Sequence, residues 1–154
     1  MKKLRVLALV HKHLVPPEDT TGLDVINVEW KMEFDVASTL EEAGHAVKVV
    51  GVHDDLGAIR AAVEDFKPDI LFNLLEAFAD ITTFDQNVVS YLELLRLSYT
   101  GCNPRGLTLA RDKSLSKKLL AYHRIPVPDF VVVLGQVPLA ANVFCATCLP
   151  VLRS

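Results

Sequence analysis

The chain has 154 residues, of which 51% are apolar and 23% charged, and its formal net charge is −3. These values predict a globular chain with a substantial core and exclude a disordered or collagen-like protein. Lysine and arginine do not cluster, so we expect no nucleic-acid partner. The three cysteines are too few for a disulfide framework, and no signal-peptide cleavage pattern is visible. Together these features favour a reducing, cytoplasmic setting.

Short apolar runs alternate with segments of helical periodicity along most of the chain. The runs predict strands at 4–10, 46–52, 70–72 and 97–100, with a further one at 130–133. The periodic segments predict helices at 28–40, 56–66 and 85–95, and a helix or pair of helices over 104–123. Asp54 or Asp55 is expected to cap the second helix, and Asp85 the third. This alternation predicts an α/β fold with a parallel β-sheet flanked by helices.

Sheets of this kind bind ligands beyond the carboxyl ends of their strands. Those ends are expected at 11–15, 52–54, 73–76 and 100–103. The sequence has no glycine-rich dinucleotide motif and no P-loop motif, so these two nucleotide-binding classes lose their main support. A response regulator is also disfavoured, because Asn73 stands where its third strand would end in aspartate.

Two pairs of residues have the side chains that metals prefer. His11 and His13 are two residues apart at a strand end, where two imidazoles can begin a metal site. No third ligand is evident, so exposed loop histidines are the simpler interpretation. Cys145 and Cys148 form one C-x-x-C pair without the second ligand pair of a structural zinc site. We therefore expect no metal site and leave the role of these cysteines open.

Glu76 and Asp80 are acids on the long loop at 74–84, for which a solvated surface position is the simpler interpretation. Asp112 can cap a helix, which places Lys113 in the first turn of that helix. A cation there opposes the helix dipole by about 0.3–1 kcal/mol. A bound anion would offset this repulsion, so Lys113 is a candidate anion-binding residue, with an ordinary exposed lysine as the alternative.

The stretch 130–152 carries no charge and is long enough to cross a bilayer. Its polar residues Gln136 and Asn142 and its prolines Pro138 and Pro150 weaken that interpretation. We therefore expect no membrane span, and a domain tethered by this stretch is the less favoured alternative.

Several motifs follow one another in the second half of the chain. They are Leu-Glu-Leu at 92–94, Tyr-Thr-Gly at 99–101, Asp-Lys-x-x-x-Lys at 112–117 and Pro-x-Pro at 126–128. In this order and spacing the sequence resembles the N-terminal part of the D-alanine–D-alanine ligases and their relatives in the ATP-grasp superfamily. The resemblance covers about residues 4–133 and is strongest from 69 onward.

The resemblance implies a Rossmann-like pre-ATP-grasp domain over 1–123, then a connector and the start of an ATP-grasp domain over 124–154. It also implies an ATP-dependent carboxylate–amine ligase, in which ATP phosphorylates a carboxylate and an amine displaces phosphate from the acyl phosphate. ATP and magnesium would be the cofactors of the complete enzyme. A small amino acid or peptide would be its substrate, and a homodimer is one assembly that the family allows.

The resemblance also assigns binding residues. Lys113 matches the lysine that reaches the ATP phosphates. Glu33 or Glu29 matches a substrate-facing glutamate on the helix after the first strand, and Asp85 matches the aspartate of a Glu-Asp-Gly segment. No catalytic residue and no metal ligand is assigned.

This sequence departs from the family at three places. Ala79 and Asp80 replace a His-Gly pair, and the loop after the first strand lacks the usual Gly-Gly, so the substrate can differ. The uncharged stretch at 135–148 does not match the family, which suggests a truncated or frameshifted continuation. We therefore expect this chain to be inactive alone and to bind neither ATP nor magnesium firmly. The alternative function is a non-catalytic α/β module that binds a small anion at the edge of its sheet.

Overall fold

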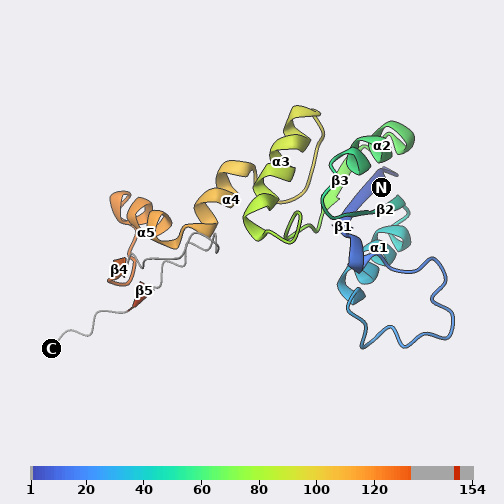
Figure 1. Ribbon diagram of the computed structural model, residues 1–154, viewed down its shortest axis with the longest axis horizontal. Coiled ribbons are helices and arrows are strands. Elements are labelled where there is room, and N and C mark those ends of the chain that lie inside the picture. Colours follow the sequence, from blue (N-terminus) through green and yellow to red (C-terminus); the bar gives the residue numbers. More distant parts are fainter. Residues whose placement is uncertain (1, 133–147, 150–154) are drawn as a thin grey trace. The chain divides into compact units, whose positions relative to one another are not determined.

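The computed structural model describes residues 2–132 and 148–149 (Figure 1). The chain divides into two compact units, Met1–Pro104 and Arg105–Ser154. The boundary expected between residues 123 and 124 lies inside the second unit and stays a prediction.

The first unit contains the alternating elements that the apolar runs predict. In chain order they are β1 (Arg5–His11), the 3₁₀ turn η1 (Lys12–Leu14), α1 (Lys31–Glu42), β2 (Ala46–Val52), α2 (Gly57–Phe66), β3 (Ile70–Asn73), the 3₁₀ turn η2 (Thr82–Phe84) and α3 (Asp85–Leu94). The second unit contains most of α4 (Pro104–Arg111), then α5 (Lys113–Tyr122), β4 (Val131–Val132) and β5 (Cys148–Leu149).

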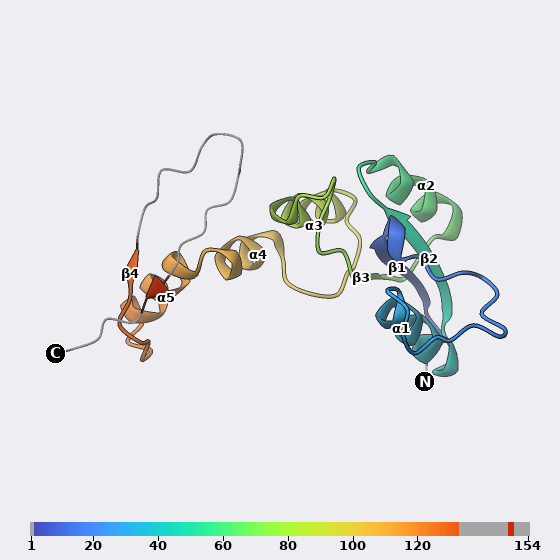
Figure 2. The same cartoon turned by 60° about the horizontal axis from the view of Figure 1, so that its bottom comes forward.

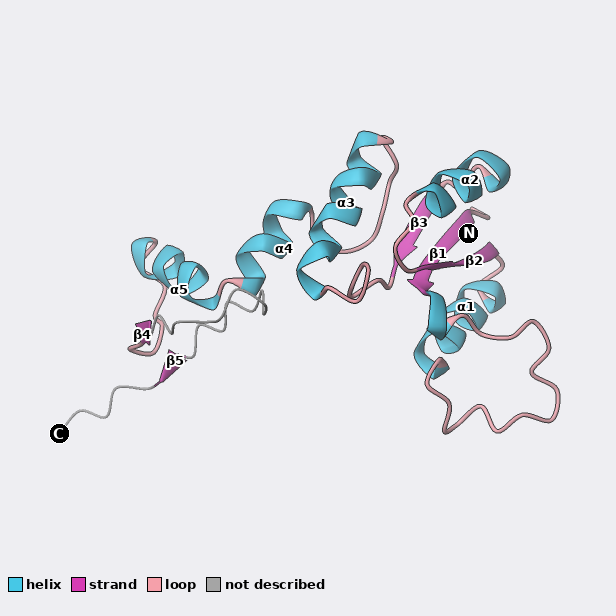
Figure 3. Ribbon diagram, in the orientation of Figure 1, coloured by secondary structure: helices cyan, strands magenta, loops and turns pink. Residues whose placement is uncertain are grey.

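Three strands of the described part of the first unit form a parallel sheet in the order β2-β1-β3. The central strand β1 is buried at five consecutive positions, Val6 to Val10. Such a run is expected where helices cover both faces of a parallel sheet. Figure 3 shows the three strands between α1 and α2. The predicted parallel sheet flanked by helices is confirmed.

Alternate side chains of β1 point to opposite faces of the sheet. Leu7 and Leu9 belong to a core cluster that also holds buried residues of α2 and α3. Figures 1 and 2 show α1 on the other side of the sheet from α2. The cluster consists of Leu7, Leu9, Val52, Ile59, Ala62, Leu71, Leu75, Val88 and Leu92. Each large side chain buried in this way contributes about 1.5–3 kcal/mol to folding.

The fourth strand expected at 97–100 does not form. A single parallel bridge joins Tyr99 to Leu71, next to β3. The segment is confined between two turns, because Arg96 adopts a φ of 56° and Gly101 a φ of 99°.

The expected helix caps are only partly correct. Asp85 is the first residue of α3 and not its cap, because the turn η2 leads directly into the helix and Phe84 takes the cap position. The Asp85 carboxylate accepts a hydrogen bond from the backbone N–H of Gln86 at 2.6 Å. Before α2, Asp55 accepts a hydrogen bond from the backbone N–H of Gly57 at 2.7 Å, although Leu56 is the cap residue.

In the second unit, Asp112 caps α5 as predicted. Its carboxylate accepts a hydrogen bond from the backbone N–H of Leu115 at 2.8 Å. Lys113 follows in the first turn and is exposed. The strand expected at 130–133 is the short β4, which pairs antiparallel with β5.

Two features of the sequence analysis fall largely outside the described residues. Cys145 lies there, and so does most of the uncharged stretch 130–152. Among the described residues, no helix is both long and apolar enough to cross a membrane.

Candidate functional site

A pocket of about 380 Å³ opens at the carboxyl edge of the sheet, where parallel α/β sheets bind their ligands. The end of β1, the start of α1 and the loop after β3 supply its walls. The lining residues are His11, Leu14, Glu29, Met32, Glu33, Leu74, Glu76, Ala77 and Asp80.

Glu33 is the buried acid of this pocket. It lies in the first turn of α1, where a carboxylate is favoured by the helix dipole, and only 2% of its surface is exposed. Its Oε2 atom has no hydrogen-bond partner among the described residues. A buried carboxylate oxygen without a partner costs free energy until a donor reaches it. A ligand group that donates a hydrogen bond to Oε2 of Glu33 would therefore be stabilised in this pocket, and a cationic donor most of all.

The second candidate glutamate, Glu29, also lines the pocket but is exposed and precedes α1. Glu76 and Asp80 bring two more exposed carboxylates to the walls. With His11 as the one basic side chain among the lining residues, the pocket favours cations over anions.

The other two predicted binding residues are not among those that line the pocket. Asp85 is buried at the start of α3 and is not among the residues that line the pocket. Its carboxylate contacts the first turn of its own helix. Lys113 belongs to α5 of the second unit.

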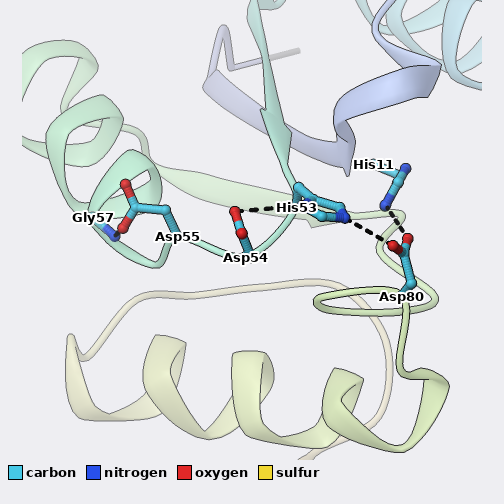
Figure 4. A network of polar contacts seen from close by, with 6 residues as sticks. All are labelled: His11, His53, Asp54, Asp55, Gly57 and Asp80. Atoms are coloured by element: carbon cyan, nitrogen blue, oxygen red, sulfur yellow. Dashed lines mark hydrogen bonds and ion pairs between the residues drawn. The ribbon is translucent and has the colours of Figure 1, made fainter.

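A cluster of histidine and aspartate side chains lies beside the pocket (Figure 4). The Nε2 atom of His53 lies 3.0 Å from Oδ2 of Asp80, and Nε2 of His11 lies 3.5 Å from Oδ1 of the same carboxylate. Oδ1 of Asp54 lies 3.4 Å from Nδ1 of His53. The hydrogen bond to Asp80 is the largest effect that raises the pKa of His53, and the same bond lowers the pKa of Asp80.

A tight turn holds Asp80 in this position. Phe78 and Ile81 pair as an antiparallel bridge, and the two residues between them, Ala79 and Asp80, have φ values of 51° and 59°. Positive φ at both central positions is the pattern of a type I′ turn, which aspartate tolerates at Asp80 but which is costly for alanine at Ala79. The backbone N–H of Ala79 donates to the carbonyl of His53 at 2.7 Å and ties the turn to the end of β2.

Gly51 allows the segment after β1 to cross the end of β2 closely. A Cβ atom at this position would lie 3.1 Å from Cα of Lys12 and 2.6 Å from Cγ2 of Val15. The close approach also brings the ring of His13 to 6.2 Å from that of His53, measured between centroids.

His11 and His13 could be named as candidate ligands from the sequence, but the contacts of His11 with Asp80 and His53 were not predicted. A signal was present, since His53 falls in the expected strand end 52–54, beside the strand end that carries His11. Adjacent parallel strands place such ends next to each other.

D-alanine–D-alanine ligases are among the known proteins that this chain resembles. No protein-family model matches the chain. D-alanine–D-alanine ligase from Moorella thermoacetica is 31% identical over 96 residues, which are 62% of this chain and 29% of that protein. The same enzyme from Novosphingobium aromaticivorans is 31% identical over 115 residues, which are 75% of this chain and 33% of that protein. The chain carries a D-alanine–D-alanine ligase-like N-terminal region.

This ligase-like region also has the fold of its relatives. A solved structure of D-alanine–D-alanine ligase from Bacillus anthracis complexed with ATP aligns with 90% of this chain and 43% of that chain. The TM-score is 0.59 at 20% sequence identity, which shows a shared fold. The chain thus spans about a third of the length of its curated relatives.

Proposed function

We propose that this chain supplies the substrate-side region of an ATP-dependent carboxylate–amine ligase, and that Glu33 binds the ammonium group of an amino acid or small peptide. The buried and unpartnered Oε2 atom of Glu33 in the pocket wall carries this proposal. The names of the relatives support the reaction class.

An ammonium group matches what Glu33 lacks. It offers up to three N–H donors and a full positive charge, so it satisfies the carboxylate oxygen and offsets its charge at the same time. A hydrogen bond between charged groups contributes about 1.5–3 kcal/mol, or roughly tenfold to a hundredfold in affinity. Glu29 and Glu76 add negative potential around the same space.

Substrate contacts in this pocket differ from those of the ligases that the sequence resembles. Asp80 stands at one position of the usual His-Gly pair, and its carboxylate is engaged by His53. We propose that the carboxylate end of the substrate is recognised by other groups, and that the substrate remains a small amino acid or peptide with a free ammonium.

Lys113 is proposed to reach an ATP phosphate. Its exposure fits an incoming phosphate, but the helix-dipole argument is weaker than the sequence indicated. The Asp112 carboxylate already accepts the hydrogen bond of the Leu115 N–H and partly offsets the charge of the lysine. When bound, ATP supplies the phosphoryl group that activates the carboxylate, and magnesium neutralises its charge. No described residue is assigned to magnesium or adenine.

The alternative module that binds a small anion at the sheet edge fits the pocket less well. Its walls carry the carboxylates of Glu29, Glu33, Glu76 and Asp80. An anion placed among them would be repelled and would leave Oε2 of Glu33 without a donor.

Calorimetry with two matched ligands tests the proposal. D-Alanine and D-lactate have nearly the same shape, but only D-alanine carries an ammonium group. We expect the chain to bind D-alanine at least tenfold more tightly than D-lactate and Glu33→Gln to remove this preference. Glu29→Gln, which changes an exposed carboxylate of the same pocket, is the matched control and should retain it. Equal binding of both ligands by the parent chain would refute the role of Glu33.

A further inference from the structure

Three side chains from separate segments bring potential metal ligands together at the carboxyl edge of the sheet. One ligand atom from each of His11, His53 and Asp80 lies within 4.8 Å of the other two. Zinc binds nitrogen and carboxylate oxygen at about 2.0–2.2 Å, so neighbouring ligands of a tetrahedral ion are separated by about 3.4 Å. The two imidazole Nε2 atoms lie 3.0 Å and 3.5 Å from the Asp80 carboxylate, close to that separation.

Asp54 provides a second and independent indication. It lies on the far side of the His53 ring, with Oδ1 3.4 Å from Nδ1, while Nε2 faces Asp80 (Figure 4). Histidines that bind metals commonly donate their other ring N–H to a carboxylate, which fixes the tautomer and leaves the ligating nitrogen unprotonated. Asp54 takes the position of such a carboxylate, at ion-pair distance from Nδ1 of His53.

The surroundings shield the cluster in part and hold Asp80 in place. The side chains of His11 and His53 are 18% and 30% exposed, whereas Asp80 is 73% exposed. The turn through Ala79 and Asp80 is anchored by the hydrogen bond from the Ala79 N–H to the His53 carbonyl. It places the Asp80 carboxylate beside the two imidazoles without a bound ion. Such preorganisation lowers the cost of assembling a site.

We propose that His11, His53 and Asp80 bind one divalent transition-metal ion of the zinc class, with Asp54 positioning His53. Two imidazoles and one carboxylate suit zinc and its neighbours, whereas magnesium prefers oxygen ligands alone. The site is therefore distinct from the magnesium that accompanies ATP in the ligases. Three protein ligands leave one coordination position for water or substrate. His11 and Asp80 also line the pocket, so this ion would sit in its wall.

Zinc and cobalt titrations of the full 154-residue chain test this site. Because thiolates also bind zinc, the parent for this test carries Cys102→Ser, Cys145→Ser and Cys148→Ser. Competition with a chromophoric chelator measures the zinc affinity and stoichiometry, and the visible spectrum of bound Co²⁺ reports tetrahedral geometry. We expect one ion per chain and a tetrahedral cobalt spectrum.

Single variants assign the ligands. His11→Ala, His53→Ala and Asp80→Asn should each weaken zinc binding at least tenfold, and Asp54→Asn should weaken it by about tenfold to a hundredfold. His123→Ala, which removes an imidazole from the end of α5, is the matched control and should leave the affinity unchanged. Because Asp80 is exposed, Asp80→Asn should fold like the parent, and circular dichroism of this variant checks that it does.

Thermal unfolding gives a second measurement on the same proteins. An ion that binds only the folded state should raise the midpoint of the parent, and should not raise that of Asp80→Asn. Absence of stoichiometric zinc binding in the parent would overturn the proposal. Binding that survives both His53→Ala and Asp80→Asn would overturn it as well. Both outcomes can be distinguished from a failure of the proposed role of Glu33, because that role is tested by D-alanine binding in the presence of a chelator.

Discussion

The phenol of Tyr99 donates a 2.8 Å hydrogen bond to the Glu93 carboxylate, and so joins two of the motifs in the sequence. Glu93 belongs to Leu-Glu-Leu at the end of α3, and Tyr99 to Tyr-Thr-Gly after it. The bond closes the turn at Arg96 and keeps Tyr99 beside Leu71, its partner in the parallel bridge. The spacing of the two motifs thus has a structural reason.

Titration of Tyr99 tests this contact. Burial, and then the hydrogen bond to Glu93, raise the pKa of Tyr99 above its ordinary value. Glu93→Gln should therefore lower that pKa. The neutral phenol is favoured in the folded state, so its contribution to stability is complete below about pH 10 and is lost as the pH rises through the raised pKa.

The absorbance of tyrosinate as a function of pH measures the pKa of Tyr99. The same titration of Tyr99→Phe gives the absorbance of the other two tyrosines, which is subtracted. A Tyr99 pKa that stays the same in Glu93→Gln would show that the contact is absent in solution.

Substitution of Gly51 tests the packing of η1 on the end of β2. Gly51→Ala places a Cβ atom 2.6 Å from Cγ2 of Val15 and 3.1 Å from Cα of Lys12, so the Val15 side chain must shift and the Lys12 backbone must give slightly, at a cost of about 1–3 kcal/mol in urea unfolding. Gly57→Ala is the matched control. Its Cβ would meet only the carboxylate of Asp55, whose rotation gives up the hydrogen bond from the Gly57 N–H, about 0.5–1.5 kcal/mol. Alanine favours a helix over glycine by a similar amount, about 1 kcal/mol, so the net change should be small. Equal stability of the two variants would contradict the close approach at Gly51.

Alanine substitutions at Asp112 and at Lys113 should change the stability of α5 by different amounts. Asp112→Ala removes the cap of α5 and should cost about 0.5–2 kcal/mol of helix stability. Lys113→Ala should leave stability unchanged or slightly improved, because its cation opposes the helix dipole. Far-ultraviolet circular dichroism during urea unfolding checks both. A larger loss for Lys113→Ala than for Asp112→Ala would show that the lysine has a structural role.

The 154-residue chain by itself should release no phosphate from ATP in the presence of D-alanine and magnesium. By resemblance, the groups that hold adenine and magnesium lie in later parts of the ligases, and the chain spans 29% of the Moorella thermoacetica enzyme. A phosphate-release assay on protein free of host ligase checks this. Turnover in such a preparation would contradict the proposal that the chain is inactive alone.

The strands were predictable because their signal is local. The range predicted for β2 agrees with Ala46–Val52, and the run at 4–10 differs from β1 by one residue at each end. The segment 97–100, Leu-Ser-Tyr-Thr, is less apolar than β1 or β2 and makes only one bridge, between the positive-φ residues Arg96 and Gly101. Strand formation there depends on tertiary pairing, which composition does not report.

The site was only partly predictable. The resemblance left Glu33 and Glu29 as alternatives, and the burial and unpartnered oxygen that distinguish Glu33 depend on how α1 packs. The contact between His53 and Asp80 depends on positive φ at Ala79 and Asp80. Alanine rarely adopts that conformation, so the sequence gives little sign of the turn.

Carbon-13 NMR of the Glu33 side chain tests the central claim most directly. The chain is labelled at glutamate carboxyl carbons, and Glu33→Gln assigns the resonance. We expect D-alanine to shift the Glu33 signal in a saturable way, D-lactate to leave it in place, and the signal of Glu93, outside the pocket, to stay unchanged. A Glu33 signal that does not respond to D-alanine, or that responds equally to D-lactate, would show that Glu33 does not bind the ammonium group.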